Sequence, residues 1–430
     1  MKIGMVTVVY KPVVNGVTNM VSLYKRQLEE LGHEVTVFTL GDPDPNGDEP
    51  GVIRSKALPL SDYGYHIGVG YTRKAQELIQ EMDVLHCHHL VAGVDIAHRY
   101  ARCPIVLTNH TRLDLYTGSF LPLPQQAADV MMRQIWPEYT DMAEVVITPS
   151  ESVRKVLIEF GVRRPIEVIP NGVDLQPFMN PAQPRSKDDL GIPESAVLMI
   201  YVGRLVDEKN VTVLLEQFTI AAEMLPDLHI CLVGTGPGEE DLKQLAESSN
   251  FADRIHFAGA VPYLEIPNIL AAADFFVTAS VTEVHPLTVI EAMAAGLPVA
   301  ATRSPGVIDT VTNNVSGFLA ADPEQGLAAA MVGLAAGPEL RMKMGEAARN
   351  ASQPYDIVST VANTVELYER LCKTRPDLHR SRPHGRWYRN RKGLRLRLDQ
   401  LASLLLPDSR RQRFLGPTSG EGEDEAYDHE

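Results

Sequence analysis

Strand-like apolar runs alternate with helical patterns along most of this 430-residue chain, and this alternation constrains the fold more than any other feature. Six such runs lie in the first half, from Lys2–Val9 to Ile166–Ile169. After the proline-containing segment Pro181–Lys187, five more follow: Val197–Val202, Leu228–Val233, Ile255–Phe257, Phe275–Thr278 and Pro298–Ala301. Alternating βα units favour parallel sheets covered by helices. We therefore predict an α/β protein of two facing, doubly wound, Rossmann-like domains, with ligands bound between them outside the carboxyl ends of the strands.

The domain boundaries follow from changes in composition. We expect a first domain over residues 1–180 and a second over residues 190–355. Residues 356–375 have an amphipathic helical pattern, and residues 376–430 are a basic amphipathic segment with an acidic end. No apolar run reaches the ~18 residues of a spanning helix, and the N-terminus resembles a strand rather than a signal peptide. Because the four cysteines lack paired spacing, we expect a cytoplasmic protein with reduced thiols.

The formal net charge of −15 is unevenly distributed. Residues 1–372 carry 27 basic against 46 acidic side chains, residues 373–413 carry 13 against 3, and residues 414–430 carry 0 against 6. The acidic body argues against nucleic acid as a partner. The basic segment offers an electrostatic footprint either for anionic lipid or for the acidic body itself.

The segment Glu283–Pro298 has the pattern of a ligand-binding helix start. Pro286 suits the first helical turn, because its missing N–H would have no partner there. The free N–H groups of Leu287 and Thr288 could then bind a diphosphate, and Glu291 could accept hydrogen bonds from ribose hydroxyls. An acidic residue ahead of a buried helix is the alternative interpretation. Helical spacing would separate Glu283 and Glu291 by ~12 Å, which does not suit the paired carboxylates of a glycoside hydrolase.

Two cations follow the first strand of the second half. Arg204 and Lys209 could converge on a pyrophosphate and stabilise the negative charge of a departing nucleoside diphosphate. No divalent metal would then be required. The alternative is a pair of surface cations in an acidic domain. We expect Glu208 only to pair with its neighbours.

Gly16 and His110 are the candidate site residues of the first half. Gly16 follows the first strand, where it would let the backbone approach a ligand phosphate or an acceptor; a simple turn glycine is the alternative. His110 follows the predicted strand Pro104–Thr108 at the edge where ligands bind, and this placement favours a functional histidine. A structural histidine is the alternative there.

Three further motifs are weaker signals. The run His86–His89 alternates between the faces of a strand and lacks a second group of ligands, so we expect no metal site there. The glycines in Gly234–Gly238 lack the full dinucleotide fingerprint. The segment Asn171–Asp174 is at least as consistent with a tight turn as with a ligand contact.

The E-x7-E motif at Glu283 and Glu291 and the G-R-L-x-x-x-K-N pattern at residues 203–210 resemble those of the retaining family 4 glycosyltransferases. The resemblance extends over residues 1–372. It implies the GT-B fold, with the acceptor on the first domain and the nucleotide sugar on the second. It also implies a UDP-sugar or GDP-sugar donor, no cofactor, and a front-face displacement that retains configuration. The helix at 356–372 would cross back onto the first domain.

The resemblance also assigns roles. It makes Gly234–Gly238 a loop on the nucleotide side and His86–His89 a strand end that lines the cleft. Glu283 would contact hydroxyls of the donor sugar, Glu291 the ribose, and His110 would lie beside the sugar. The chain departs from the family pattern at His285-Pro286, where many members have a glycine. This change removes one donor N–H from the phosphate-binding turn.

The basic segment bears on the acceptor. Four leucines recur there on one helical face beside several arginines: Leu394, Leu398, Leu401 and Leu405. An interfacial membrane helix, a solvated tail and a helix docked on the acidic body all remain open. Membrane contact would place the protein peripherally at the inner face of the cell membrane. It would also fit a diacylglycerol, polyprenyl or inositol lipid acceptor, as in the bacterial lipid glycosyltransferases that two segments resemble.

Two alternatives remain open for function. The same fold could serve a soluble sugar acceptor. The chain could also be a non-catalytic nucleotide-sugar-binding protein, although keeping Arg204, Lys209, Glu283 and Glu291 together argues against that hypothesis.

Overall fold

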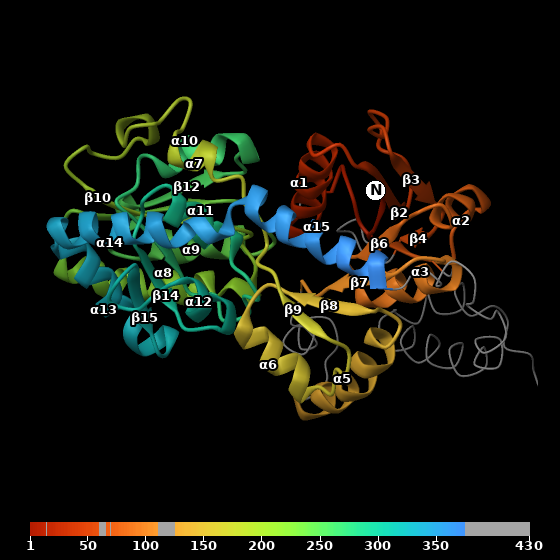
Figure 1. The fold of residues 1–430 in the computed structure, drawn as a ribbon. Helices are drawn as coiled ribbons and strands as arrows, with labels where there is room; N and C mark the ends of the chain where they lie inside the picture. Colours follow the sequence, from red (N-terminus) through yellow and green to blue (C-terminus); the bar gives the residue numbers. More distant parts are fainter. Residues whose placement is uncertain (14, 60–65, 69, 111–124, 375–430) are drawn as a thin grey trace, which may run out of the picture.

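The computed structural model describes residues 1–13, 15–59, 66–68, 70–110 and 125–374. The basic segment predicted at 376–430 lies outside the described residues. Two sheets with parallel pairing form two lobes, and helices pack on both (Figure 1). This arrangement confirms the predicted architecture of two doubly wound α/β domains.

The first sheet has seven strands in the order β3-β2-β1-β6-β7-β8-β9. Their bounds in that order are Val52–Ser55, Glu34–Leu40, Lys2–Val6, Val84–Cys87, Ile105–Thr108, Val145–Thr148 and Ile166–Val168. Ile3 and Met5 of β1 face one apolar core, whereas Val6 belongs to the other. Burial on both faces explains why the central strands β1, β6, β7 and β8 are mainly apolar runs.

The second sheet has six strands in the order β12-β11-β10-β13-β14-β15. Their bounds are Ile255–Gly259, Leu228–Val233, Val197–Val202, Phe275–Thr278, Val299–Thr302 and Gly317–Ala320. In both sheets the strand order reverses beside the first strand of the lobe, between β1 and β6 and between β10 and β13. Ligands of such sheets bind outside the carboxyl ends of the strands at this reversal.

Fourteen α-helices are assigned in the described part of the chain. They are α1 (Gly16–Glu30), α2 (Arg73–Ile79), α3 (Asp95–Tyr100), α5 (Gln125–Thr140), α6 (Glu151–Glu159), α7 (Gln176–Met179), α8 (Val211–Met224), α9 (Glu239–Ser248), α10 (Ile266–Leu270), α11 (Leu287–Ala294), α12 (Pro305–Thr310), α13 (Pro323–Ala336), α14 (Pro338–Ser352) and α15 (Ile357–Thr374). The side chain of Asn15 caps α1 by accepting a hydrogen bond from the N–H of Thr18.

The residue pattern of Ala92–Ala101 predicts a helix over this range, but the observed helix begins later. Val91 is extended and Ala92 has a left-handed backbone with φ of 59°, so the regular helix α3 starts only at Asp95. A residue with positive φ interrupts a right-handed helix. The prediction was therefore wrong for the first turn of this helix.

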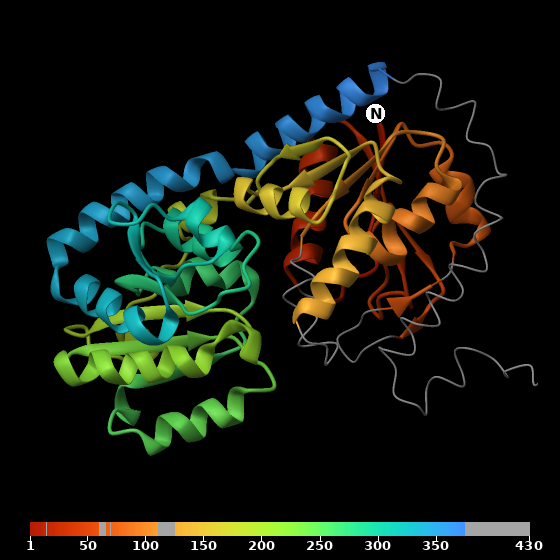
Figure 2. The ribbon, with the colours of Figure 1, turned by 90° about the horizontal axis from the view of Figure 1, so that it is seen from below.

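The last helix joins the two lobes. Figures 1 and 2 show α14 lying on the second lobe and α15 continuing from it across to the first. Val361, Leu367 and Tyr368 of α15 are buried in the same core as Ile3 of β1. The chain therefore returns to the first lobe after completing the second.

No helix within the described ranges is both long and apolar enough to cross a bilayer.

Candidate active site

An ion pair joins the two motifs that carry most of the predicted chemistry. Lys209 ends the short turn η3 (Asp207–Lys209) after β10, and its Nζ lies 2.7 Å from Oε1 of Glu283, which follows β13. Asn210 adopts a left-handed backbone with φ of 51°, and its side chain donates to the carbonyl of Ala279 at 3.2 Å. These contacts hold Lys209 and Glu283 together at the carboxyl ends of adjacent strands.

Glu283 is ionised in this pair. Burial, the largest single influence, would raise the pKa of its carboxyl, but the charge and hydrogen bond of Lys209 lower it together with Ser280 and Arg204, so the net shift is downward. The site therefore contains a desolvated carboxylate with a cation against it. A neutral sugar hydroxyl can donate to such a carboxylate, and an arriving diphosphate can share the ammonium.

Arg204 lies on the exposed side of the same loop. Its guanidinium pairs with the carboxylate of Glu208, as the sequence indicated, and about half of its side chain is exposed. The hydroxyl of Tyr201 donates to the carbonyl of Arg204 at 3.0 Å. Arg204 is thus anchored through its backbone, with a side chain accessible to a ligand.

The glycines after β11 support this loop through their backbone. A Cβ on Gly234 would lie 1.9 Å from the carbonyl oxygen of Gly203, and one on Gly236 would lie 2.2 Å from that of Leu205. Only glycine allows this close approach. The segment therefore packs against the loop that carries Arg204, which gives these glycines a structural role.

Helix α11 begins opposite the first lobe. Pro286 occupies the N-cap position, one residue earlier than the first helical turn in which we predicted it, and Leu287 is the first helical residue. The first N–H groups of a helix have no partner within it, so those of Leu287 and Thr288 are available to a ligand. A Cβ on Gly16 would lie 3.9 Å from Cδ1 of Leu287. The two predicted phosphate-side elements therefore face each other across the two lobes.

Glu291 lies one turn into α11 and is only 5% exposed. Its Oε1 accepts a hydrogen bond from the hydroxyl of Tyr263 at 3.0 Å. Burial raises the pKa of Glu291 to about 7, although the Tyr263 hydrogen bond acts in the opposite direction. Nothing in the sequence marked Tyr263, because it lies on a different element, 28 residues away.

His110 lies in a separate group of histidines, of which His86 and His88 are buried. Its Nε2 lies 3.0 Å from Nδ1 of His88, and the two rings stack with their centroids 5.3 Å apart. His86 contacts the Tyr368 hydroxyl through Nδ1 and Thr108 Oγ1 through Nε2, both at 2.5 Å. Burial lowers the pKa of all three imidazoles, so they are neutral.

The spacing of these histidines explains their grouping. His86 and His88 are two residues apart at the end of β6, so their side chains lie on one face, and His110 follows the neighbouring strand β7. Among the described residues, no group of three or more His, Cys, Asp or Glu is arranged to hold a metal ion. Tyr368 was not foreseen as a partner, since it comes from α15, 282 residues away.

His285 is buried behind the start of α11. Its ring packs edge-on against Tyr355, with the centroids 5.1 Å apart, and burial lowers its pKa to about 4. Neither ring nitrogen has a hydrogen-bond partner among the described residues. The residue that replaces a smaller one in the family pattern is thus accommodated as a packed neutral imidazole.

The segment Asn171–Asp174 forms the connection between the lobes. Gly172 packs so closely on α15 that a Cβ would lie 2.2 Å from Oγ1 of Thr360. The carboxylate of Asp174 lies 2.8 Å from the guanidinium of Arg26 on α1. These contacts support the structural interpretation of this turn.

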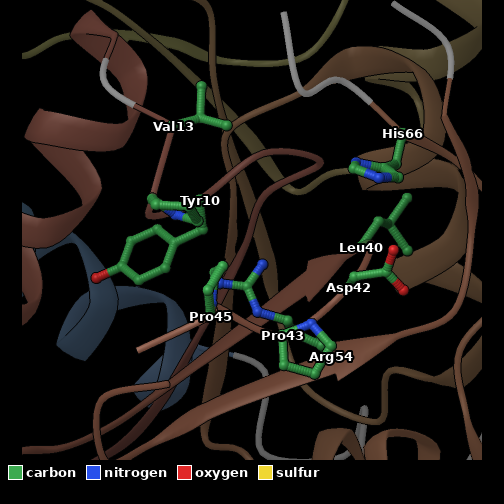
Figure 3. Close-up of a pocket in the computed structure, with 9 residues that line it drawn as sticks. Tyr10, Val13, Leu40, Asp42, Pro43, Pro45, Arg54 and His66 are labelled. Carbon is green, nitrogen blue, oxygen red and sulfur yellow. The ribbon is translucent and has the colours of Figure 1, made fainter. Parts of the chain in front are cut away.

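A cavity of about 210 Å³ lies on the first lobe beside the ends of β1 and β2 (Figure 3). Tyr10 and Val13 line it on the side leading to Gly16, and Asp42, Arg54 and His66 supply polar groups. Arg54 Nε donates to Asp48 at 2.7 Å, which fixes its side chain in the wall. The cavity is therefore a concave surface of the first lobe, lined by apolar side chains together with these polar groups.

Family comparisons cover most of the chain. Residues 182–351 match the family described as glycosyl transferases group 1. Residues 14–177 match the family described as Glycosyltransferase Family 4. The two matches correspond to the second and first lobes.

Two relatives match over more than two thirds of this chain. An alpha-monoglucosyldiacylglycerol synthase from Acholeplasma laidlawii is 28% identical over 394 residues, which cover 87% of this chain and 96% of that protein. A D-inositol 3-phosphate glycosyltransferase from Arthrobacter sp. (strain FB24) is 30% identical over 317 residues, covering 69% of this chain and 73% of that protein. Among solved structures, Anabaena Alr3699/HepE in complex with UDP superposes with a TM-score of 0.69 at 20% identity, covering 86% of this chain and all of that one.

Proposed function

The chain belongs to the family 4 glycosyltransferases of the GT-B fold, and we propose that it transfers a hexose from a nucleoside-diphosphate sugar to an acceptor hydroxyl with retention of configuration. The observation that carries this proposal is the Lys209–Glu283 pair beside the start of α11, 2.7 Å between charged atoms. A fixed cation, a partly buried carboxylate and a helix N-terminus fit the diphosphate and sugar of such a donor.

Each group has a proposed role in transfer. Lys209 and the N–H groups of Leu287 and Thr288 bind the diphosphate, and the accessible guanidinium of Arg204 joins them as negative charge develops on the leaving group. Glu283 accepts hydrogen bonds from sugar hydroxyls. Because these cations supply the positive charge, we propose that the chemistry requires no divalent metal.

The proposed donor contains UDP or GDP. The Anabaena Alr3699/HepE structure is a complex with UDP, and the same protein has also been solved with UDP-glucose. Glu291 would bind the ribose, which both nucleotides share. His110 would contact the donor sugar from the first lobe, with His88 behind it at 3.0 Å.

For the acceptor we favour a membrane glycerolipid or an inositol or polyprenyl lipid. The synthase from Acholeplasma laidlawii, named for a glucosyldiacylglycerol, matches over 87% of this chain. The basic segment at 376–430 supports the same proposal through its charge and leucine pattern. An enzyme with such an acceptor would work as a peripheral protein at the inner face of the membrane. The relative named for inositol 3-phosphate favours a soluble acceptor as the second candidate.

A product-partition experiment tests the proposal. Purified protein is incubated with a panel of radiolabelled UDP- and GDP-hexoses and a bacterial lipid extract, and the products are separated into organic and aqueous phases. We expect label in the organic phase with one donor. Label transferred only to added inositol phosphate or free sugars would support the soluble acceptor, and no transfer from any donor would contradict the proposed activity.

A further inference from the structure

Tyr263 contacts the carboxylate assigned to the ribose. It opens the short turn η5 (Tyr263–Glu265) after β12, and its hydroxyl donates to Oε1 of Glu291 at 3.0 Å. Glu291 is 5% exposed, whereas Tyr263 is 40% exposed, so the tyrosine extends from solvent to the buried carboxylate. We propose that Tyr263 is a positioning residue that orients Glu291 toward the ribose hydroxyls of the donor, an inference that rests on the proposed function.

The ring of Tyr263 is held in place from the other side. Phe178 of α7 packs edge-on against it, with the centroids 6.2 Å apart and an interplanar angle of 66°, and Phe178 itself is buried in the core of the second lobe. The hydroxyl uses one lone pair of Oε1. A carboxylate has about four acceptor positions, so Oε2 and the rest of Oε1 remain for the two ribose hydroxyls.

The same hydrogen bond favours the form of Glu291 that can accept from a diol. Burial raises the pKa of Glu291 to about 7, and the Tyr263 hydrogen bond is the influence that lowers it. Once protonated, the carboxyl loses acceptor capacity toward the ribose. Nucleotide affinity should therefore fall as the pH drops below neutrality, and removing the hydroxyl should move that fall to higher pH.

The other charged groups around this pair are engaged elsewhere. Asp174 and Arg26, which influence Tyr263, form their own ion pair at 2.8 Å. Arg349 of α14 donates to the carbonyl of Ala295 at the far end of α11, and Asp309 of α12 accepts from the N–H of Ser152. His285, ahead of α11, is kept neutral by burial. Tyr263 is thus the group through which the ionisation of Glu291 can be tuned.

Calorimetric titration with UDP and GDP between about pH 5.5 and about pH 8.5 tests the proposal, because this range brackets the pKa of Glu291. We expect Tyr263→Phe to shift the midpoint of the affinity profile to higher pH while leaving the high-pH affinity within about threefold of wild type. In Glu291→Gln, the nucleotide affinity should depend on pH only through the phosphate of the ligand, whose second pKa is about 6. Tyr71→Phe, which removes a buried hydroxyl in the first lobe, is the matched control and should follow wild type.

Three results would overturn the positioning role of Tyr263 or the proposed function itself. Thermal unfolding confirms that each variant is folded. An unchanged midpoint in Tyr263→Phe would overturn the positioning role. An equal loss of affinity at every pH would also overturn it, since that pattern marks a direct contact between Tyr263 and the nucleotide. If wild-type protein bound neither nucleotide at any pH, the proposed function would fail first, and the inference with it.

Discussion

At the scale of single residues, Lys209 is held by Glu283 at 2.7 Å and is proposed to bind the diphosphate during transfer. We expect Lys209→Ala or Arg204→Ala to lower kcat by an amount equivalent to about 2–4 kcal/mol. Each substitution removes a cation that would stabilise the negative charge of the leaving diphosphate. Lys243→Ala is the matched control, since it breaks an ion pair of the same 2.7 Å length on α9. Steady-state kinetics and melting temperatures are measured together. Near-normal kcat in both site variants would contradict their role.

Removing Glu291 and removing Glu283 should have different effects on nucleotide binding and on catalysis. Glu291→Ala is expected to weaken the binding of free nucleoside diphosphate, because Glu291 is assigned to the ribose. Glu283→Ala should mainly slow sugar transfer, because free diphosphate lacks the sugar that Glu283 is proposed to contact. Calorimetric titration with UDP or GDP, paired with kcat, measures both effects. Equal losses of diphosphate affinity in the two variants would show that this division of roles is wrong.

At the scale of elements, α12 supports the segment that carries Glu283. The N–H of Gly306 donates to the carbonyl of Glu283 at 3.0 Å, and a Cβ on Gly306 would lie 2.5 Å from the backbone of Val284. Gly306→Ala should therefore displace Glu283 and lower kcat more than it lowers nucleotide affinity. Both are measured on the same preparation. Unchanged kcat with a lowered melting temperature would limit Gly306 to a role in stability.

Elements could be predicted from the sequence where burial dominates and missed where it does not. Strands such as β10 and β11 are buried on both faces, so their apolar runs were recognised with their correct ends. The strands β3 and β15, at one edge of each sheet, were not predicted, and both are only partly buried. Partial burial is not the whole reason, because the partly buried edge strand β9 was predicted. The late start of α3 depends on the backbone of Ala92, which no pattern of residue types reveals.

The candidate site, like the fold, could be predicted from the sequence only in part. Lys209 and Glu283 could be found because each follows a strand at the ligand edge, but their pairing depends on β10 and β13 being neighbours. Tyr263 and Tyr368 reach Glu291 and His86 from distant elements. Contacts of this kind arise from tertiary packing and leave no periodic signal in the sequence.

At the scale of the whole molecule, the acidic body and the basic segment suggest how the enzyme would reach a lipid. Removing residues 376–430, which follow the described end of α15, should leave the two lobes folded and abolish binding to anionic liposomes. The leucine face and its arginines would supply insertion and attraction, at ~1 kcal/mol per surface cation. Sedimentation with liposomes of varied anionic content measures this. Full-length protein that stays in the supernatant at low salt would contradict membrane binding.

The central claim is transfer from a nucleotide sugar with retention, driven by protein cations rather than a metal. The most direct measurement is the anomeric configuration of the first product, determined by NMR in the presence of EDTA with the donor and acceptor that the product-partition experiment identifies. We predict an α-linked product from an α-linked donor, formed at a rate that EDTA leaves largely unchanged. A β-linked product, or transfer that stops with EDTA and returns with Mg²⁺, would contradict the account.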